Sequence, residues 1–309
     1  MDRQLLLNKK EAVYGTDPGP AAVDTLMAEA VRFALKGTDV GSDPSKPGVG
    51  ATPSFTYGQH VELSFEVALA SSGEAGVAPK WGALLKQAGF KETLVAGTSV
   101  TYELLDDPSS SDSGTFVWRD AKRLHKITGA RGRVGLKATA GQRPTLTMAF
   151  KGLYTPVAAG AALVGADADF DDWNEAQPIA QGRTTFSFGG VNMPLRELTA
   201  EPTDNVVFVD LPHQENVQLL GERAFTGKIK ATMPEVGTYN PEAAWSSRER
   251  QAFVLGHETE AGKVVTITGQ GQVGEPSYSR DNGADVFEQS LKLLGSDLAA
   301  SDDLVIVLT

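Results

Sequence analysis

Apolar and polar residues alternate most regularly between residues 61 and 67. Every second residue there is apolar, namely Val61, Leu63, Phe65 and Val67. Because successive side chains of a strand point to opposite faces, this segment predicts a strand with one buried face and one wet face. Similar patterns predict strands at 99–105, 115–119, 133–139, 145–150, 225–232, 263–269 and 285–294.

Two short helices are expected between these strands. Residues 79–89 have Pro79 near the start and Gly89 at the end, and a second helix should open at Asn240-Pro241-Glu242. The apolar positions of residues 23–35 fit a helix and a strand almost equally well, so both remain open. The rest of residues 1–58 is expected to be irregular. Within it, the Gly- and Pro-rich residues 37–58 are expected to form an extended arm that contacts another subunit.

The order of the elements recurs along the chain. A strand, a helix with a tryptophan and two further strands occur in this order between residues 61 and 151, and again between 225 and 294. The second half lacks the strand-rich insert that follows the helix in the first half, so the duplication rests on element order. A chain of 309 residues is also long enough for two domains. We therefore expect a mainly β protein with two tandem domains, 1–154 and 183–309, joined by a linker at 155–182.

Residues 269–274 match G-x-G-x-x-G, the phosphate-binding pattern of dinucleotide-binding folds. That chemistry needs a helix N-terminus directly after the glycines. Here Glu275-Pro276-Ser277 follows, which does not indicate a helix. We interpret the pattern as a Gly-rich β-turn.

An acidic run at residues 167–172 resembles the start of a calcium-binding loop. The sixth position of such a loop needs Gly and is Asp172, and the twelfth needs Glu and is Pro178. A solvated acidic linker is therefore the preferred interpretation.

The chain lacks the usual catalytic constellations. It contains no cysteine, which excludes thiol nucleophiles, disulfides and thiolate metal sites. The histidines lack the spacing of a zinc site and are expected on the surface; they are His60, His125, His213 and His257. No nucleophile elbow or P-loop is present. We predict no catalytic residue, no cofactor and no metal, and hence no enzyme.

The charge of the chain points away from nucleic-acid binding. A net charge of −11 opposes broad attraction to DNA phosphates. Basic residues concentrate only between 119 and 143, with Trp118 as the one neighbouring aromatic residue. We interpret the first part of this concentration as a strip that meets acidic surface on a neighbouring subunit: Arg119, Lys122, Arg123, Lys126, Arg131 and Arg133. Residues 1–10 are too short for a signal or spanning segment, so synthesis and assembly in the host cytoplasm are expected.

Several segments resemble the major tail tube proteins of transposable, non-contractile-tailed bacteriophages. They are residues 5–18, residues 60–90 with their Trp-Gly-Ala-Leu-Leu helix, residues 125–154 and residues 264–307. The resemblance covers the first half more fully than residues 155–223. It rests on the order and extent of these segments, since none is a catalytic motif.

The resemblance implies a tail-tube β-sandwich in each domain, with a short helix packed outside. Inner sheets of neighbouring subunits would join into a ring-shaped β-barrel around a lumen. Duplicated members of the family form trimeric rings with pseudo-sixfold symmetry, and this chain is expected to belong with them. Its implied location is the phage tail of the virion. Its implied partners are further copies of itself, a tape-measure protein and tail-end proteins, with DNA passing through the lumen without specific binding.

Strand alternation then assigns side chains to the lumen. If the strands at 61–67 and 225–232 line the bore, their polar faces present Glu62, Ser64, Glu66, Thr226, Lys228 and Lys230 to it. The net charge of the chain suggests that negative potential dominates there.

A β-sandwich binding module for carbohydrate or cell-surface recognition is the alternative. Such a module normally gathers aromatic residues in one exposed strip. The tryptophans of this chain are instead dispersed, at Trp81, Trp118, Trp173 and Trp245. Particle size distinguishes the two, because a binding module stays a monomer or small oligomer.

Overall fold

The computed structural model describes residues 4–120, 122–221, 223–297 and 300–309. Strands make up most of the regular structure in these residues, and the two α-helices, α1 (Gly82–Gln87) and α2 (Pro241–Ser247), are short. The expectation of a mainly β protein is confirmed. No helix in this part of the chain is long and apolar enough to cross a bilayer.

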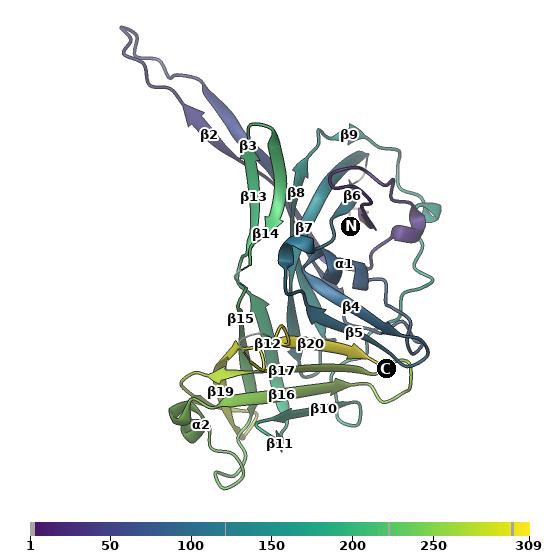
Figure 1. Cartoon of the computed structure of the whole chain (residues 1–309), viewed down its shortest axis with the longest axis vertical. Helices are drawn as coiled ribbons and strands as arrows, with labels where there is room; N and C mark the ends of the chain where they lie inside the picture. The colour runs from purple at the N-terminus through teal and green to yellow at the C-terminus, as the bar shows by residue number, and fades with distance from the viewer. Residues whose placement is uncertain (1–3, 121, 222, 298–299) are drawn as a thin grey trace.

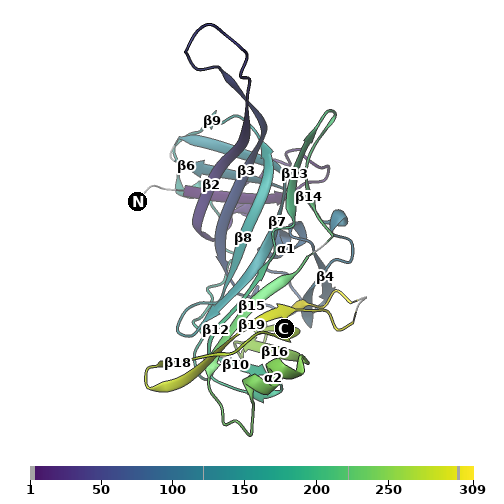
Figure 2. The ribbon, with the colours of Figure 1, turned by 90° about the vertical axis from the view of Figure 1, so that its left-hand side faces the viewer.

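Eight antiparallel strands form the main sheet, which runs along the molecule (Figure 2). Four come from each half of the chain, in the spatial order β2 (Ala28–Gly41), β3 (Ser54–Ala68), β8 (Thr145–Tyr154), β7 (Arg123–Thr139), β12 (Leu195–Pro202), β15 (Phe225–Thr232), β19 (Ala284–Leu293) and β18 (Ser277–Asp281). The halves meet where residues 136–139 of β7 face residues 197–200 of β12. We call this pairing the internal seam.

Strand β7 belongs to two layers. Before a register shift between Thr128 and Arg131 it pairs with β6 (Gly114–Asp120), which pairs with β1 (Gln4–Lys10). After the shift it continues into the main sheet. The ring of Phe116 on β6 lies 5.9 Å from that of Phe65 on β3 and 4.9 Å from that of Phe150 on β8. The first half is therefore a sandwich with these rings between its layers.

The second half repeats this pairing pattern. Strand β17 (Val265–Val273) pairs with β16 (Arg250–His257), which pairs with β10 (Thr184–Phe188), while the end of β17 joins β19. The outer layer also connects the two halves, because β20 (Leu304–Leu308) pairs with β17 on one side and with β5 (Ser99–Leu104) on the other. Strand β4 (Phe90–Val95) pairs with the other edge of β5. The two-residue strands β9 (Ala158–Ala159) and β11 (Val191–Asn192) pair with β7 and β10, respectively.

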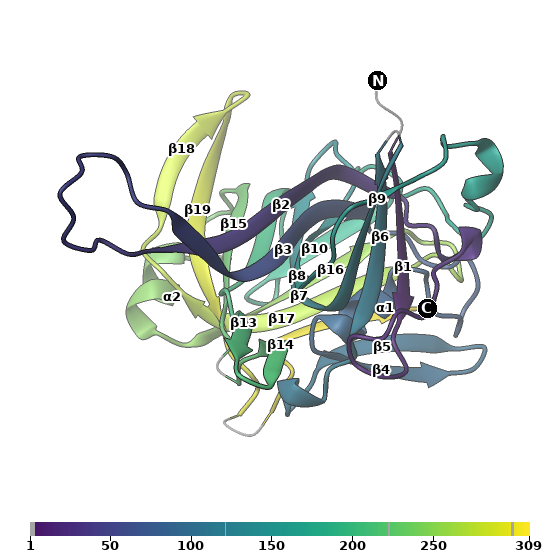
Figure 3. The same ribbon diagram turned by 90° about the horizontal axis from the view of Figure 1, so that it is seen from above.

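Two hairpins extend from the main sheet (Figures 1 and 3). The distal parts of β2 and β3 form the longer one, and its residues 42–53 form an irregular tip. The other consists of β13 (Val206–Leu211) and β14 (Gln214–Leu219), inserted between β12 and β15. The hydroxyl of Tyr57 donates to the carbonyl of Asp210, so the turn end of the β13–β14 hairpin touches the longer hairpin.

The alternation in β3 is confirmed. The four apolar side chains of the predicted buried face are at most 2% exposed, whereas Glu62, Ser64 and Glu66 on the other face are half-buried. The predicted helix start at Asn240 is also confirmed, because its side chain accepts hydrogen bonds from the backbone amides of Glu242 and Ala243.

Two expectations about local structure were wrong. Residues 4–58 are not mainly irregular, because β1 and β2 lie within them. Strand β2 also decides the open choice between helix and strand for most of residues 23–35. The G-x-G-x-x-G run is not a turn: residues 269–273 lie inside β17, where a side chain at Gly271 would collide with the backbone of Lys292. Strands there pack too closely for any other residue.

Residues 155–182, the expected linker between the domains, make hydrogen bonds with the first half of the chain. The backbone amide of Ile179 donates to the carbonyl of Gln142 at 2.9 Å, and the indole of Trp173 donates to the carbonyl of Thr25 at 3.0 Å. This segment therefore packs along the first half before the second half begins.

Replacing Phe116 by Ala should lower the free energy of unfolding by about 3–5 kcal/mol, because the ring is fully buried between the layers. Denaturant unfolding measures the change. Phe55→Ala is the matched control, since Phe55 is 73% exposed on the long hairpin, and it should shift stability by less than about 0.5 kcal/mol. Equal losses in the two variants would contradict the sandwich described here.

Candidate functional site

The face of the main sheet turned away from the core is polar. Strand β3 contributes Glu62, Ser64 and Glu66, and strand β15 contributes Thr226, Lys228 and Lys230. Cross-strand pairing carries the same face from one half to the other, with Lys137 opposite Thr199 and Thr199 opposite Lys228. The six side chains predicted to share one environment thus lie on one face of one sheet. We call it the polar face.

The polar face carries both signs of charge. Its acidic side chains are Glu29, Glu62, Glu66, Glu197, Glu201, Asp281 and Glu288. Its basic side chains are more numerous: Arg32, Lys36, Arg131, Arg133, Lys137, Lys151, Lys228, Lys230 and Lys292. Several are neutralised locally, as by the 3.0 Å ion pair of Lys228 with Glu288. The acid excess of the whole chain is therefore not found on this face, contrary to the expected negative dominance.

A carboxylate sits over the internal seam because Gly135 leaves room for it. A side chain at Gly135 would collide with the carboxylate of Glu201 on β12. The hydroxyl of Thr147 donates to Glu201 at 2.9 Å, yet burial still raises the pKa of this carboxyl group. Beside it, the guanidinium of Arg133 donates to the carbonyl of Pro202 at 3.1 Å. Side chains of the first half therefore form hydrogen bonds with residues of the second half across the seam.

The main sheet ends in two open edges. Among the described strands, β2 pairs only with β3 at one end of the sheet, and β18 pairs only with β19 at the other. Residues 277–280 of β18 are exposed, as are most of the side chains of β2. An unpaired strand edge is a template for pairing with another chain.

The predicted basic strip is largely engaged within the chain. Arg119 forms a 3.0 Å ion pair with Asp167, Arg123 pairs with Asp120, and Lys126 pairs with Asp17. Lys122 is exposed. Contact of this strip with a neighbouring subunit stays a prediction, now centred on the exposed Lys122 and on Arg123.

Arg131 and Arg133, the last two residues of the strip, connect the two halves of one chain. The guanidinium of Arg131 donates to the carbonyl of Val217 at 3.2 Å and lies 5.3 Å from the ring centre of Tyr14. The hydroxyl of Tyr14 in turn accepts from the backbone amide of Val217 at 2.6 Å. These contacts fix β14 against the first half. The sequence reasoning missed this hairpin, although the alternation at residues 214–219 could have indicated a strand.

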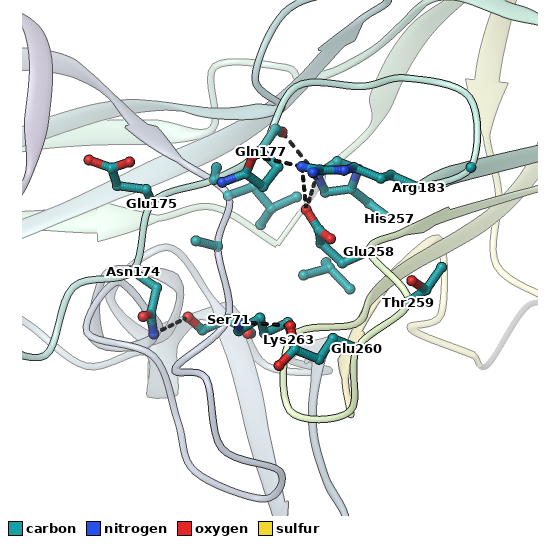
Figure 4. Close-up of a pocket in the computed structure, with 15 residues that line it drawn as sticks. Ser71, Asn174, Glu175, Gln177, Arg183, His257, Glu258, Thr259, Glu260 and Lys263 are labelled. Atoms are coloured by element: carbon teal, nitrogen blue, oxygen red, sulfur yellow. Dashed lines mark hydrogen bonds and ion pairs between the residues drawn. The ribbon is translucent and has the colours of Figure 1, made fainter.

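A cavity of about 650 Å³ lies between the segment 174–183 and the start of β17 (Figure 4). His257 lines it and is 3% exposed. One ring nitrogen, Nδ1, lies 2.8 Å from the hydroxyl of Thr184, and Nε2 lies 3.1 Å from the carbonyl of Gln177. Burial lowers the pKa of His257, and the nearby carboxylate of Glu258 opposes part of this effect.

Other side chains that line the cavity also contact protein partners. Lys263 and Glu260 form a 2.9 Å ion pair (Figure 4). The hydroxyl of Ser71 donates to the carbonyl of Gly262 at 2.6 Å. Both ring nitrogens of His257 are occupied, so its geometry is that of a structural histidine. The expectation that all histidines lie on the surface was wrong for His257, because its imidazole bridges β10 and the preceding segment.

The acidic run at 167–172 makes separate local contacts. Asp167 accepts from the backbone amide of Val164 at 2.8 Å, and Asp172 pairs with Lys80 at 2.7 Å. Within the described residues, no group of three His, Asp or Glu side chains is arranged to hold a metal ion. These carboxylates therefore lack the convergence that a hard cation requires.

Comparisons with known proteins add no family to this picture: no protein-family model matches the chain, and no curated protein matches it. The polar face, its two open edges and the hairpins are therefore the features from which a function is inferred.

The buried neutral ring of His257 should make stability depend on pH. As pH falls below about 6.5, the unfolded chain binds a proton at this residue that the folded chain resists, so the free energy of unfolding should fall. His257→Asn removes this contribution. The difference in unfolding free energy between wild type and variant should therefore shrink from pH 7.5 to pH 5.5, as measured by denaturant titration at each pH.

His213→Asn is the control for this experiment, because His213 is exposed at the turn between β13 and β14. This variant should keep the pH dependence of the wild type. An unchanged pH dependence in His257→Asn would show that the buried ring does not resist protonation.

Proposed function

We propose that this protein is the structural subunit of a phage tail tube, assembling into stacked rings through which DNA is delivered. The observation that carries the proposal is the eight-stranded sheet, which joins four strands of each half, is polar on one face, and is open at both edges. The resemblance of residues 5–18 and 60–90 to tail tube proteins points the same way.

The sheet is suited to closing into a ring. Copies that join head to tail through two different edges form closed rings when the rotation between them is right. Closure removes both exposed edges and leaves the polar face on the inside of a barrel. Because the pairing pattern occurs twice in the chain, three chains would supply six similar units, with two tandem tail-tube-type domains in each chain.

The long hairpin supports stacking. Residues 37–58 project beyond the sandwich (Figure 1), and apolar side chains such as Val40, Phe55 and Tyr57 are more than half exposed on it. Apolar side chains on a projecting segment are typical of a contact with another subunit. We assign this arm to a neighbouring chain of the tube. The tape-measure and tail-end proteins remain implied partners, and the virion is the implied location.

Electron microscopy of the assembled protein tests the proposal. We expect stacked rings with threefold symmetry, six similar lobes in each ring, and the arm in contact with a neighbouring chain. A sixfold ring of six chains would contradict the role of the duplication. A protein that stays a monomer or small oligomer at all concentrations would favour the binding-module alternative.

The polar face predicts how DNA interacts with the bore. Glu62 and Glu66 contribute negative charge to a face that already holds more basic than acidic side chains. Replacing both by Lys should leave assembly intact but slow DNA passage during infection, because each added cation can neutralise a phosphate. The defect should ease at higher salt, which screens these charges.

The double variant Glu62→Gln, Glu66→Gln is the matched control, because it removes the negative charge without adding positive charge. It should slow DNA delivery less than the Lys variant. A Lys variant that stays folded but fails to form tubes would place these carboxylates at an interface between subunits instead.

A further inference from the structure

We infer that β18 of one chain pairs with β2 of a second copy in the register that the internal seam defines, with Ser279 opposite Arg32. The inference rests on the proposed assembly function and adds to it the identity of the contacting residues. It follows from the recurrence of one strand pattern in the two halves and from the geometry of their seam.

Equivalent positions in the halves follow from strand ends and pairing. Strand β3 ends with Ala68 opposite Thr145, and β15 ends with Thr232 opposite Val286. Counting from these ends, Glu66 of β3 corresponds to Lys230 of β15. Their partners on the next strands in the sheet then correspond as well.

The equivalent residues of the two edge strands, β18 and β2, follow from the residues with which they pair. On one side of the sheet, Lys137 of β7 pairs with Thr145, and Ser279 of β18 pairs with Val286, so Lys137 and Ser279 are equivalent. On the other side, Thr199 of β12 and Arg32 of β2 are equivalent, since they pair with Lys228 and Ser64. Both strands also carry a register shift near this point, between Glu29 and Arg32 in β2 and between Leu195 and Glu197 in β12.

The internal seam then serves as the template. Lys137 lies opposite Thr199 there, so its equivalent Ser279 lies opposite the Arg32 of the next copy. The direction of the strands agrees with this assignment. Because all eight strands are antiparallel to their neighbours, the first and last run in opposite directions and can pair antiparallel with each other.

Burial shows what the second copy would cover. Leu136, next to Lys137 in the internal seam, is fully buried opposite Ala200. Its equivalent, Tyr278, is 52% exposed at the open edge. In the inferred register Tyr278 faces Phe33, a half-buried ring that stacks on Trp118 at 5.1 Å. An exposed aromatic residue at one edge thus meets an aromatic residue at the other, a favourable cross-strand pair.

Cysteine cross-linking tests the register, because the chain has no cysteine of its own. A chain carrying Arg32→Cys and Ser279→Cys, both at exposed positions, is assembled and oxidised. We expect covalent dimers and trimers on a non-reducing gel, since directly opposite positions approach disulfide distance. Lys137→Cys with Thr199→Cys is the intrachain positive control, with the same geometry in the template.

A slipped pair distinguishes this register from its neighbours. Arg32→Cys with Ser277→Cys places the cysteines diagonally and should cross-link at least several-fold less. Tubes seen by microscopy in which only the slipped pair, or neither pair, cross-links would overturn the register and leave the proposed function standing. Absence of rings and of intermolecular cross-links in a protein whose internal control does cross-link would overturn the proposed function and, with it, this inference.

Discussion

The pairing of β7 with β12 is the interaction on which the rest of the architecture depends. Strand β7 can make it only because its register shifts between Thr128 and Arg131, which turns the strand from the outer layer into the main sheet. Gly129 occupies the shift with a φ of +59°, and a side chain there would lie 2.8 Å from the ring of Tyr14. A β-bulge of this kind bends a strand and changes its direction without ending it. The same residue thus permits both the change of layer and the packing of Tyr14 that holds the β13–β14 hairpin.

The internal seam is reinforced in ways that the open edges are not. Behind it, β20 pairs with β5, so the outer layer also crosses between the halves. The hairpin of β4 and β5 has no counterpart in the second half, where β16 begins directly after α2. A seam between chains built on the same main-sheet register would therefore lack this outer pairing. The chain should persist as a unit under conditions that separate neighbouring chains, which suits a subunit that must fold before it assembles.

Local patterns in the sequence could predict the strands but not their partners. The alternation around Phe65 identified a buried face correctly because one residue in two contacts the core. Residues 23–35 stayed ambiguous because β2 is bulged near Ala30, whose φ of +51° breaks the two-residue period. The contacts of Arg131 with Val217, like the internal seam, join residues far apart in sequence. No local periodicity encodes such pairings, so the basic strip was assigned to another subunit when two of its members join the halves of one chain.

The charge of the polar face shows why net charge is a poor guide to a surface. Acidic residues are concentrated elsewhere, as at 167–172 and around Glu258 and Glu260. On the polar face, several acidic and basic side chains of neighbouring strands form ion pairs, as Lys228 and Glu288 do, although Lys151 and Arg131 lie opposite each other. Opposite charges a few ångströms apart cancel at distances beyond the Debye length, about 8 Å at physiological salt. A bore lined in this way would present DNA with basic side chains that are partly neutralised by acidic side chains on neighbouring strands. DNA phosphates would make brief contacts at every ring with basic side chains whose charge nearby acidic side chains partly neutralise. The weak retention of DNA would then follow from this local neutralisation and not from uniform repulsion.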